Sequence, residues 1–184
     1  QCSSACRGTT RFALLKQPPG RTADLTMNSS ARTQHPIKIV SGGQTGVDQA
    51  ALAVAIELQI PHGGWCPAGR LAEDGPLNER YHLTETESPG YRQRTKHNVQ
   101  DSDGTLIVNL GPLEGGTFST VRLAEKQSKP FLVVALDDGV TEEAIASVRE
   151  WLKGNGVRVL NIAGPRESKR PGIYELTKTL LEKL

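Results

Sequence analysis

The chain has 184 residues and a net charge of +2, and only 4% of its residues are aromatic. This length suits one domain with its own core, while the interspersed charges and few aromatic residues argue against a nucleic-acid-binding surface. No apolar run approaches the roughly 20 residues of a membrane span, and three cysteines without a repeated spacing argue against a disulfide framework or a metal site. We therefore expect a soluble protein of the cytoplasm.

Residues 1–35 differ from the rest of the chain, because they are rich in Ser, Thr, Arg, Pro and Gly and lack helical or strand periodicity. This composition predicts a disordered N-terminal tail. It is also typical of a transit peptide. Because Met27 is the only methionine and the chain begins with Gln1, we favour non-native upstream sequence for residues 1–26. The ligand-binding domain is then expected to span residues 36–184.

The first half of this domain begins with an apolar β-branched run and continues with a helical pattern. A long loop rich in Gly, Pro and Asp follows the second predicted strand and runs to about residue 89. The predicted elements are a strand at Ile37–Val40, a helix at Val47–Leu58, a strand at His62–Trp65 and a polar helix at Tyr91–Gln100.

The second half alternates strands and helices more regularly. Thr141 is a good N-cap, with two glutamates in the first turn behind it. The predicted strands are Thr105–Leu110, Pro130–Leu136 and Val157–Ile162, and the predicted helices are Thr117–Gln127, Thr141–Lys153 and Gly172–Lys183.

This alternation predicts the fold class. Strands separated by helices of 10–15 residues pair in parallel through right-handed crossovers, which predicts an α/β three-layer sandwich with a mainly parallel sheet of about five strands. Loops that leave parallel strands meet at the carboxyl edge of the sheet, where α/β proteins bind ligands. We therefore expect the loops at 41–46, 66–80, 111–117 and 163–170 to converge.

A glycine loop joins the first predicted strand to the first helix. It matches neither a Walker A motif nor a G-x-G-x-x-G fingerprint, but its free N–H groups and the helix dipole suit a phosphate. Three glycines in five residues exceed what a tight turn needs, although a simple turn stays an alternative. The candidate binding residues are Gly42, Gly43, Gln44, Thr45 and Gly46, with Asp48 placed to bind a ribose or an amine.

A second glycine turn precedes the helix at Thr117–Gln127. Gly115 and Gly116 supply free amides, and Thr117 and Thr120 supply hydroxyl groups near the helix start. The alternative is a glycine-rich loop that Thr117 simply caps. We expect these four residues to contact the phosphate together with the first glycine loop.

Further polar side chains lie in the other loops of this edge. Arg70 and Arg166 are candidate counter-charges for an anion, and Asp74 is a candidate for orienting hydroxyl or amino groups. Trp65 is either a cover for a ring or a core residue. Cys66 is a candidate ligand or nucleophile, but a buried structural thiol is favoured because it has no partner at ligand spacing.

Residues 36–184 contain several unusual sequence blocks: Gly42–Asp48, His62–Pro67, Ala72–Pro76, Tyr81, Arg94-Thr95, Asn98-Val99, Asp101–Thr105, Gly115–Thr117 and Asn161–Ser168. They resemble the bacterial putative molybdenum carrier family, also described as circularly permuted YpsA-related SLOG proteins. The resemblance implies a Rossmann-like fold of the lysine-decarboxylase-like superfamily, a nucleotide or the molybdenum cofactor (molybdopterin) as ligand, and a homo-oligomer, expected to be a dimer.

One departure from related proteins bears on function. Phosphoribohydrolases of this superfamily carry a catalytic glutamate in a Pro-Gly-Gly-x-Gly-Thr-x-x-Glu motif, and alignment on Gly115-Gly116 places Arg122 at that position. The sequence therefore favours a binding protein for a phosphate-bearing, nucleotide-like ligand over an enzyme. The alternative is a nucleoside monophosphate N-glycosidase, in which Glu73, Asp74 or Glu114 acts as acid and base.

Overall fold

Five parallel strands form the central sheet, in the order β2-β1-β9-β7-β8. Ile39 of β1 lies opposite His62 of β2 on one side and Leu160 of β9 on the other. The strands are β1 (Lys38–Val40), β2 (His62–Gly63), β7 (Gly104–Asn109), β8 (Phe131–Ala135) and β9 (Val159–Ala163). This confirms the predicted parallel sheet of five strands.

The computed structural model describes residue 36 and residues 38–184. The prediction of an N-terminal tail at residues 1–35 lies outside the described residues, as does the expected start of the first strand at Ile37. None of the helices within residues 38–184 has the length and the apolar character that crossing a membrane requires.

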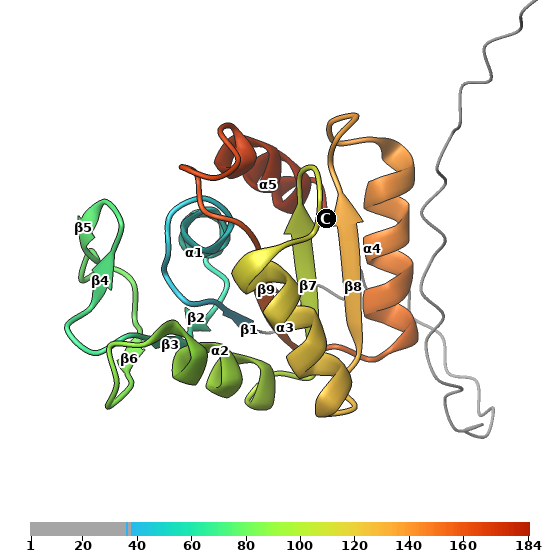
Figure 1. The fold of residues 1–184 in the computed structure, drawn as a ribbon. Coiled ribbons are helices and arrows are strands. Elements are labelled where there is room, and N and C mark those ends of the chain that lie inside the picture. The colour runs from blue at the N-terminus through green and yellow to red at the C-terminus, as the bar shows by residue number, and fades with distance from the viewer. Residues whose placement is uncertain (1–35, 37) are drawn as a thin grey trace, which may run out of the picture. The chain divides into compact units, whose positions relative to one another are not determined.

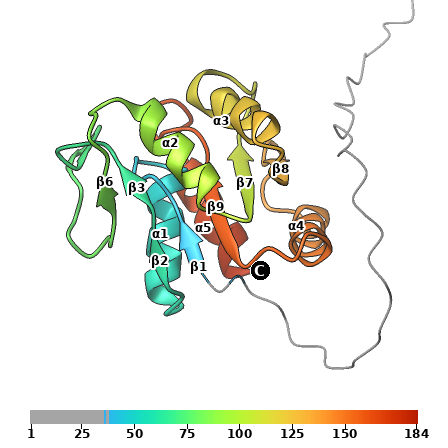
Figure 2. The same cartoon turned by 90° about the horizontal axis from the view of Figure 1, so that it is seen from below.

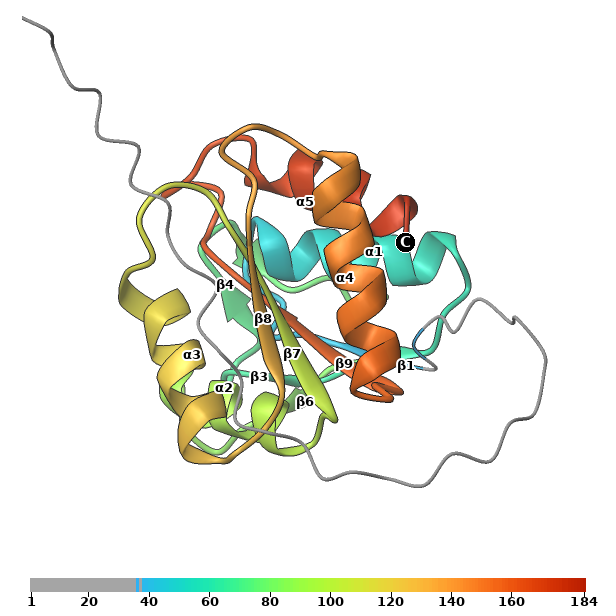
Figure 3. The same cartoon turned by 90° about the vertical axis from the view of Figure 1, so that its right-hand side faces the viewer.

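Helices cover both faces of the sheet, as Figures 1 and 3 show. The helices α1, α4 and α5 lie on one face, and α2 and α3 pack against each other on the opposite face (Figure 2). Their bounds are α1 (Val47–Glu57), α2 (Tyr91–Gln100), α3 (Gly115–Lys126), α4 (Glu142–Gly154) and α5 (Ile173–Glu182). The predicted three-layer sandwich is therefore confirmed.

The main core lies between the sheet and the face formed by α1, α4 and α5. Val54 of α1, Trp151 of α4 and Leu180 of α5 belong to the same buried cluster as Leu106 and Ile162 of the sheet. The N-cap prediction for α4 is also confirmed, because the Thr141 hydroxyl accepts a hydrogen bond from the Ala144 amide. These contacts hold the strand ends in place for the loops that follow them.

The prediction of one strand at His62–Trp65 is wrong. The chain leaves the main sheet after Gly63 and forms β3 (Trp65–Cys66), which pairs with β6 (Thr84–Glu85) in a separate parallel pair. The break falls at Gly64, which has a φ of 124° and whose added Cβ would lie 2.2 Å from the Ser41 carbonyl oxygen. Only glycine allows the two backbones to approach this closely.

The segment predicted as a loop up to residue 89 contains further structure. The strands β4 (Leu71–Ala72) and β5 (Gly75–Pro76) form a small hairpin, which projects beyond the β2 edge of the main sheet in Figure 1. A second buried cluster supports this region and contains Leu52, Cys66, Leu77, Tyr81 and Leu83. Short strands of two residues carry no periodic pattern, so the sequence did not predict them.

The order in which successive strands are added to the sheet reverses near its centre. The connection after β1 leads to β2 on one side, whereas the connection after β7 leads to β8 on the other. Such a switch point leaves a crevice at the carboxyl ends of the strands. The loops that follow β1, β7 and β9 border this position, and the candidate site lies there.

Candidate functional site

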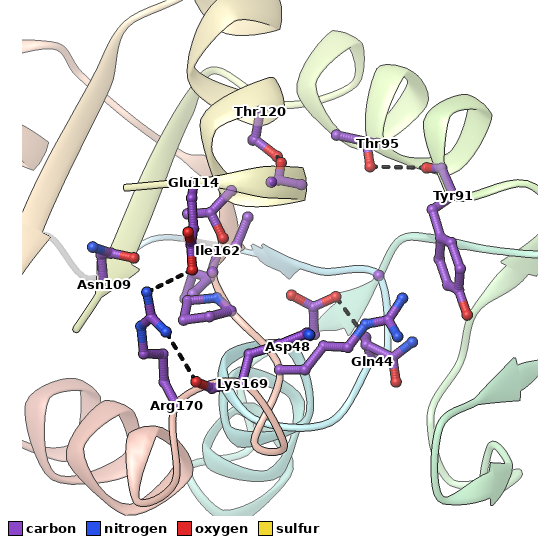
Figure 4. A pocket seen from close by; sticks show the side chains of 18 of the residues that line it. Gln44, Asp48, Tyr91, Thr95, Asn109, Glu114, Thr120, Ile162, Lys169 and Arg170 are labelled. Carbon is purple, nitrogen blue, oxygen red and sulfur yellow. Dashed lines mark hydrogen bonds and ion pairs between the residues drawn. The ribbon is translucent and has the colours of Figure 1, made fainter. Parts of the chain in front are cut away.

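A cavity of about 630 Å³ opens at the switch point of the sheet (Figure 4). Its size falls in the range of about 300–1,000 Å³ that is usual for small-molecule sites. Segments that are far apart in the sequence line it together: the loop after β1, the face of α2, the start of α3 and the loop after β9. The polar and glycine residues of its wall are Gly42, Gln44, Asp48, Tyr91, Arg94, Thr95, Asn98, Asn109, Glu114, Gly115, Gly116, Thr117, Thr120, Gly164, Arg166, Lys169 and Arg170.

The N-terminus of α3 forms one end of the cavity. Within residues 38–184, the amides of Gly115, Gly116 and Thr117 have no hydrogen-bond acceptor, and the N-cap residue Glu114 makes no capping bond with its side chain. The first backbone bond runs from the Phe118 amide to the Glu114 carbonyl, at 3.2 Å. The three open N–H groups and the helix dipole therefore favour an anion at this end.

A buried ion pair forms the opposite wall. Arg94 of α2 donates from Nη1 to Asp48 Oδ2 of α1 at 2.7 Å, and the two side chains are 13% and 6% exposed. The pair crosses directly over Gly42, whose added Cβ would lie 1.2 Å from Arg94 Nη1. A side chain at Gly42 would therefore displace the Arg94 guanidinium from its contact with Asp48.

Gln44 lies beside this pair and has a divided role. Its Oε1 accepts hydrogen bonds from the Thr45 amide at 3.0 Å and from the Glu73 amide at 2.8 Å. Its Nε2 is buried and has no acceptor among the described residues, and the same is true of Arg94 Nε. A buried donor without a partner costs about 1–3 kcal/mol. Both nitrogen atoms are covered by surrounding protein atoms, so this part of the wall carries the cost of two unpartnered donors.

Basic side chains border the mouth of the cavity. The Arg166 guanidinium lies over the Tyr91 ring at 4.7 Å from the ring centroid. Arg170 donates to the Leu110 carbonyl at 2.6 Å and to Glu114 Oε1 at 2.8 Å. Four cationic and two acidic side chains line the cavity, so its electrostatic balance favours an anionic ligand.

Most of the predicted binding residues lie in this wall. The structure brings Gly42, Gln44 and Asp48 of the first glycine loop and helix together with Gly115, Gly116, Thr117 and Thr120 of the second, and it adds Arg166. The Thr120 hydroxyl donates to the Gly116 carbonyl at 3.0 Å. The two glycine junctions therefore face one cavity.

Five predicted residues lie outside the cavity lining: Gly43, Thr45, Gly46, Arg70 and Asp74. Each has a structural contact instead. The Thr45 hydroxyl hydrogen-bonds to Glu73, and the Asp74 carboxylate accepts from Gln49 Nε2 at 3.2 Å. An added Cβ at Gly43 would meet Leu77 and Leu83 of the second cluster, and one at Gly46 would meet the backbone of residues 165–167.

Arg70 has the clearest difference from its predicted role as a counter-charge. Its guanidinium donates to the carbonyl groups of Leu83 at 2.9 Å and of Tyr81 at 3.0 Å. These bonds hold the loop between β5 and β6. The Arg70 side chain therefore stabilises the backbone of this loop and does not line the cavity. Arg94 is a cationic side chain that does line it.

Two further candidates, the aromatic Trp65 and the sulfur-containing Cys66, also make structural contacts. Trp65 donates from its indole to Asp101 at 2.7 Å and packs on the His97 ring. Cys66 is a free thiol that is fully buried in the second cluster. Burial raises the pKa of this thiol, and nearby Arg70 opposes that shift only in part. The prediction of a buried structural cysteine is the one that these surroundings favour.

Glu73 joins three segments beside the cavity. It accepts from the hydroxyl groups of Thr45 and Ser168, the latter at 2.7 Å, and lies 3.8 Å from Arg166. Burial acts to raise its pKa, but the hydrogen bonds from Thr45 and Ser168 and the charge of Arg166 outweigh this, so that the pKa lies below its usual range. Glu73 therefore links the β4–β5 hairpin to the loops after β1 and β9 as a carboxylate.

Sequence reasoning missed part of the wall. Tyr91, Asn109, Lys169 and Arg170 line the cavity but were not among the predicted binding residues. Arg94 and Asn98 are four residues apart in a predicted helix and so share one face, and Tyr91 lies one turn before Arg94 on that face. The sequence therefore contained a signal that one face of α2 carries polar residues of the site. Arg170 had none, because its contacts depend on how the loops after β7 and β9 meet.

Arg122 lies away from this cavity. Its side chain is 69% exposed and pairs with Glu125 at 3.3 Å, one turn further along α3. The position that aligns with the phosphoribohydrolase glutamate is therefore on the solvent face of the helix. The carboxylates in the cavity wall are those of Asp48 and Glu114.

Comparisons with known proteins agree with this fold. The sequence profile of the circularly permutated YpsA SLOG family matches residues 39–184. A solved structure of a putative molybdenum carrier protein from Syntrophus aciditrophicus is 49% identical in sequence, with a TM-score of 0.79. The alignment covers 80% of the present chain and 94% of that protein. No match was found among curated proteins. The fold is thus Rossmann-like, as predicted.

Proposed function

Because the chain belongs to the circularly permutated YpsA SLOG family, we propose that it binds a small phosphate-bearing, nucleotide-like molecule in the cavity at the switch point. The observation that carries the proposal is the open N-terminus of α3. Gly115 and Gly116 are exposed, and their amides and that of Thr117 have no acceptor within residues 38–184. Such amides are a preferred site for a phosphate group.

The surroundings of this helix end support a ligand with more than a phosphate. The cavity extends from α3 to the buried pair of Asp48 and Arg94, and its volume of about 630 Å³ exceeds what a free phosphate needs. Lys169 and Arg166 add positive charge at the mouth. A phosphate at α3 with an attached polar ring system towards Gln44 would occupy both ends.

The name of the structural neighbour suggests a cargo. That protein is called a putative molybdenum carrier, and the molybdenum cofactor is a pterin that bears a phosphate. The open amides of α3 fit the phosphate, and the cavity has room for an attached ring system beyond it. We extend the proposal to such a molecule as cargo, with the phosphate as the group that the chain recognises.

The test removes one amide N–H group at a position with free space for a Cβ. An added Cβ at Gly116 would meet no atom within 4 Å, and proline is tolerated in the first turn of a helix. We expect G116P to weaken the binding of inorganic phosphate and of nucleoside monophosphates by about tenfold, the usual value of a hydrogen bond to a charged group. Isothermal titration calorimetry measures this.

The variant G116A is the matched control, since it adds a Cβ but keeps the N–H group. It should bind phosphate as the unmodified chain does. Equal affinities of G116P and G116A, or no binding of any phosphate compound to the unmodified chain, would contradict the proposal.

The second candidate function is cleavage of a nucleoside monophosphate at its glycosidic bond. It is favoured by Glu114, whose exposed carboxylate lies at the α3 end of the cavity and is held by Arg170 at 2.8 Å. Release of free base from a nucleoside monophosphate, measured by chromatography and lost in E114Q, would support an enzyme. Saturable binding without release of base supports a carrier.

Two finer expectations belong to the same proposal. The family resemblance favours a homodimer, which light scattering after size-exclusion chromatography tests. A cytoplasmic location is the expectation from composition, and microscopy of the tagged full chain in its own host tests it. Both stay predictions.

A further inference from the structure

We infer that the ligand carries a second anionic group, set apart from the phosphate at α3 by a sugar or a ring, and that Arg166 binds this group. The inference rests on the proposed function and concerns the side of the cavity at Tyr91, opposite the start of α3. The observation that carries it is a guanidinium in the cavity wall that makes no hydrogen bond within the protein.

Arg166 lines the cavity with a charge that no carboxylate contacts directly. Its side chain is 37% exposed, and its guanidinium donates no hydrogen bond to any acceptor within residues 38–184. The nearest carboxylate is that of Glu73, at 3.8 Å. Both oxygens of Glu73 already accept hydrogen bonds, from Thr45 and Ser168. The five N–H donors of Arg166 are therefore available to a bound molecule.

The other two arginines of the cavity wall differ in this respect. Arg94 Nη1 donates to Asp48 at 2.7 Å, and Arg170 Nη2 donates to Glu114 at 2.8 Å. Each of these cations has its own carboxylate, whose negative charge offsets the attraction for a further anion. Arg166 has no such partner at hydrogen-bond distance, so it is the arginine of this wall that is best placed to receive an anion.

Tyr91 holds the Arg166 guanidinium in position. It is the first residue of α2 and is 42% exposed, and Arg166 Cζ lies 4.7 Å from the centroid of its ring. The π electrons of the ring attract the cation but provide no oxygen or nitrogen acceptor, so the contact leaves the N–H groups free. A planar fork of donors held in this way suits two oxygens of a phosphate or a carboxylate.

This cation and the open amides of α3 lie on different sides of the cavity. Figure 4 shows Glu114, the residue before α3, and Tyr91 on opposite sides, with Asp48 between them. The phosphate at the amides is therefore not the anion that faces Arg166. A cavity of about 630 Å³ has room for one ligand that reaches both sides. Its two anionic groups are then separated by a sugar or a ring, because two adjacent phosphates span too little distance.

Two isomers test this spacing. Adenosine 3′,5′-bisphosphate and adenosine 5′-diphosphate carry the same number of phosphates, which the ribose separates in the first and which are adjacent in the second. The full chain is titrated calorimetrically with both isomers, with adenosine 5′-monophosphate and with inorganic phosphate. We expect the bisphosphate to bind at least about tenfold more tightly than the diphosphate, the usual value of a hydrogen bond to a charged group.

Substitution of Arg166 tests the residue itself. We expect R166Q to lose the preference for the bisphosphate over the diphosphate, and R166K to keep only part of it because lysine lacks the planar fork. R92Q is the matched control. It makes the same charge change at an exposed position of α2 outside the cavity lining, and it should keep the full preference.

Substitution of Tyr91 tests the positioning role. Y91F keeps the ring under the guanidinium and should keep the preference for the bisphosphate. Y91L removes the ring, and we expect it to reduce the preference by about threefold, the usual value of an exposed contact between a cation and an aromatic ring. Equal preferences in Y91F and Y91L would show that the ring does not position Arg166.

The outcomes separate this inference from the proposed function. If the two isomers bind equally to the unmodified chain, or if R166Q keeps the preference, the inference is wrong while phosphate binding stands. It is also wrong if R166Q weakens all three adenosine compounds by the same factor, because Arg166 then binds the ring or the first phosphate. If no phosphate compound binds, the proposed function fails, and this inference fails with it.

Discussion

Gly42 shows how one residue without a side chain determines the cavity wall. Arg94 and Asp48 come from different helices and meet directly above its Cα, where an added Cβ would lie 1.2 Å from Arg94 Nη1 and 2.9 Å from Asp48 Oδ2. The need for glycine here comes from space and not from a left-handed φ. At Gly116 an added Cβ meets nothing within 4 Å, so that glycine is free of this constraint.

The first prediction follows from this contrast. G42A displaces the guanidinium and leaves the buried Asp48 without its partner, so we expect the free energy of unfolding to fall by about 2–4 kcal/mol. G116A should change it by no more than about 0.5 kcal/mol. Urea denaturation followed by circular dichroism measures both variants, and equal stabilities would show that Arg94 does not need the space over Gly42.

At the scale of elements, the start of α3 depends on a loop from elsewhere in the chain. Arg170, which follows β9, donates to the carbonyl groups of Leu110 and Pro112 and to the Glu114 carboxylate. These three contacts hold the second glycine turn from its beginning to the residue before α3. The side chain therefore positions the open amides rather than only adding charge.

The second prediction tests this positioning role. R170A should weaken inorganic phosphate binding by about tenfold, and R170K should restore only part of it because lysine lacks the planar fork of donors. Hydrogen exchange of the amides of residues 110, 111, 113 and 114 should become faster in R170A. The control R122A removes the same charge from the exposed face of α3, where it pairs with Glu125, and should leave both readouts unchanged.

At the scale of the whole molecule, Glu73 joins three separate loops and so contributes to global stability. Its pKa lies below its ordinary value, because hydrogen bonds from Thr45 and Ser168 and the charge of Arg166 outweigh the effect of burial. A carboxyl group whose pKa is lowered by folding stabilises the folded state above its unfolded pKa, about 4.3 for glutamate. That stabilisation is lost as the pH falls through the folded-state pKa.

The third prediction follows from the sign of this shift. E73Q should be less stable than the unmodified chain at pH 7, and the difference should shrink as the pH is lowered below about 4. Urea denaturation at a series of pH values measures it. E150Q, on the exposed face of α4, is the control. A difference between E73Q and the unmodified chain that stays constant with pH would contradict the assigned cause.

The candidate site was predictable from the sequence where its residues follow strands directly. Gly42, Gln44 and Asp48 come after β1, and Gly115 and Gly116 come after β7, so parallel pairing alone brings them to one edge. Arg70 shows the limit of this argument. Arg70 follows β3, which pairs with β6 and does not belong to the main sheet. Its side chain therefore donates to the carbonyl groups of Leu83 and Tyr81 instead of lining the cavity.

The sequence by itself determined the three layers, the parallel sheet and the two glycine junctions, because hydrophobic periodicity and turn residues are local signals. Only the tertiary structure decided that Arg94 pairs with Asp48, that Arg170 holds the second turn and that Gln44 keeps a free donor. Contacts of this kind join residues that are tens of positions apart. They depend on how loops meet in space, which no local pattern encodes.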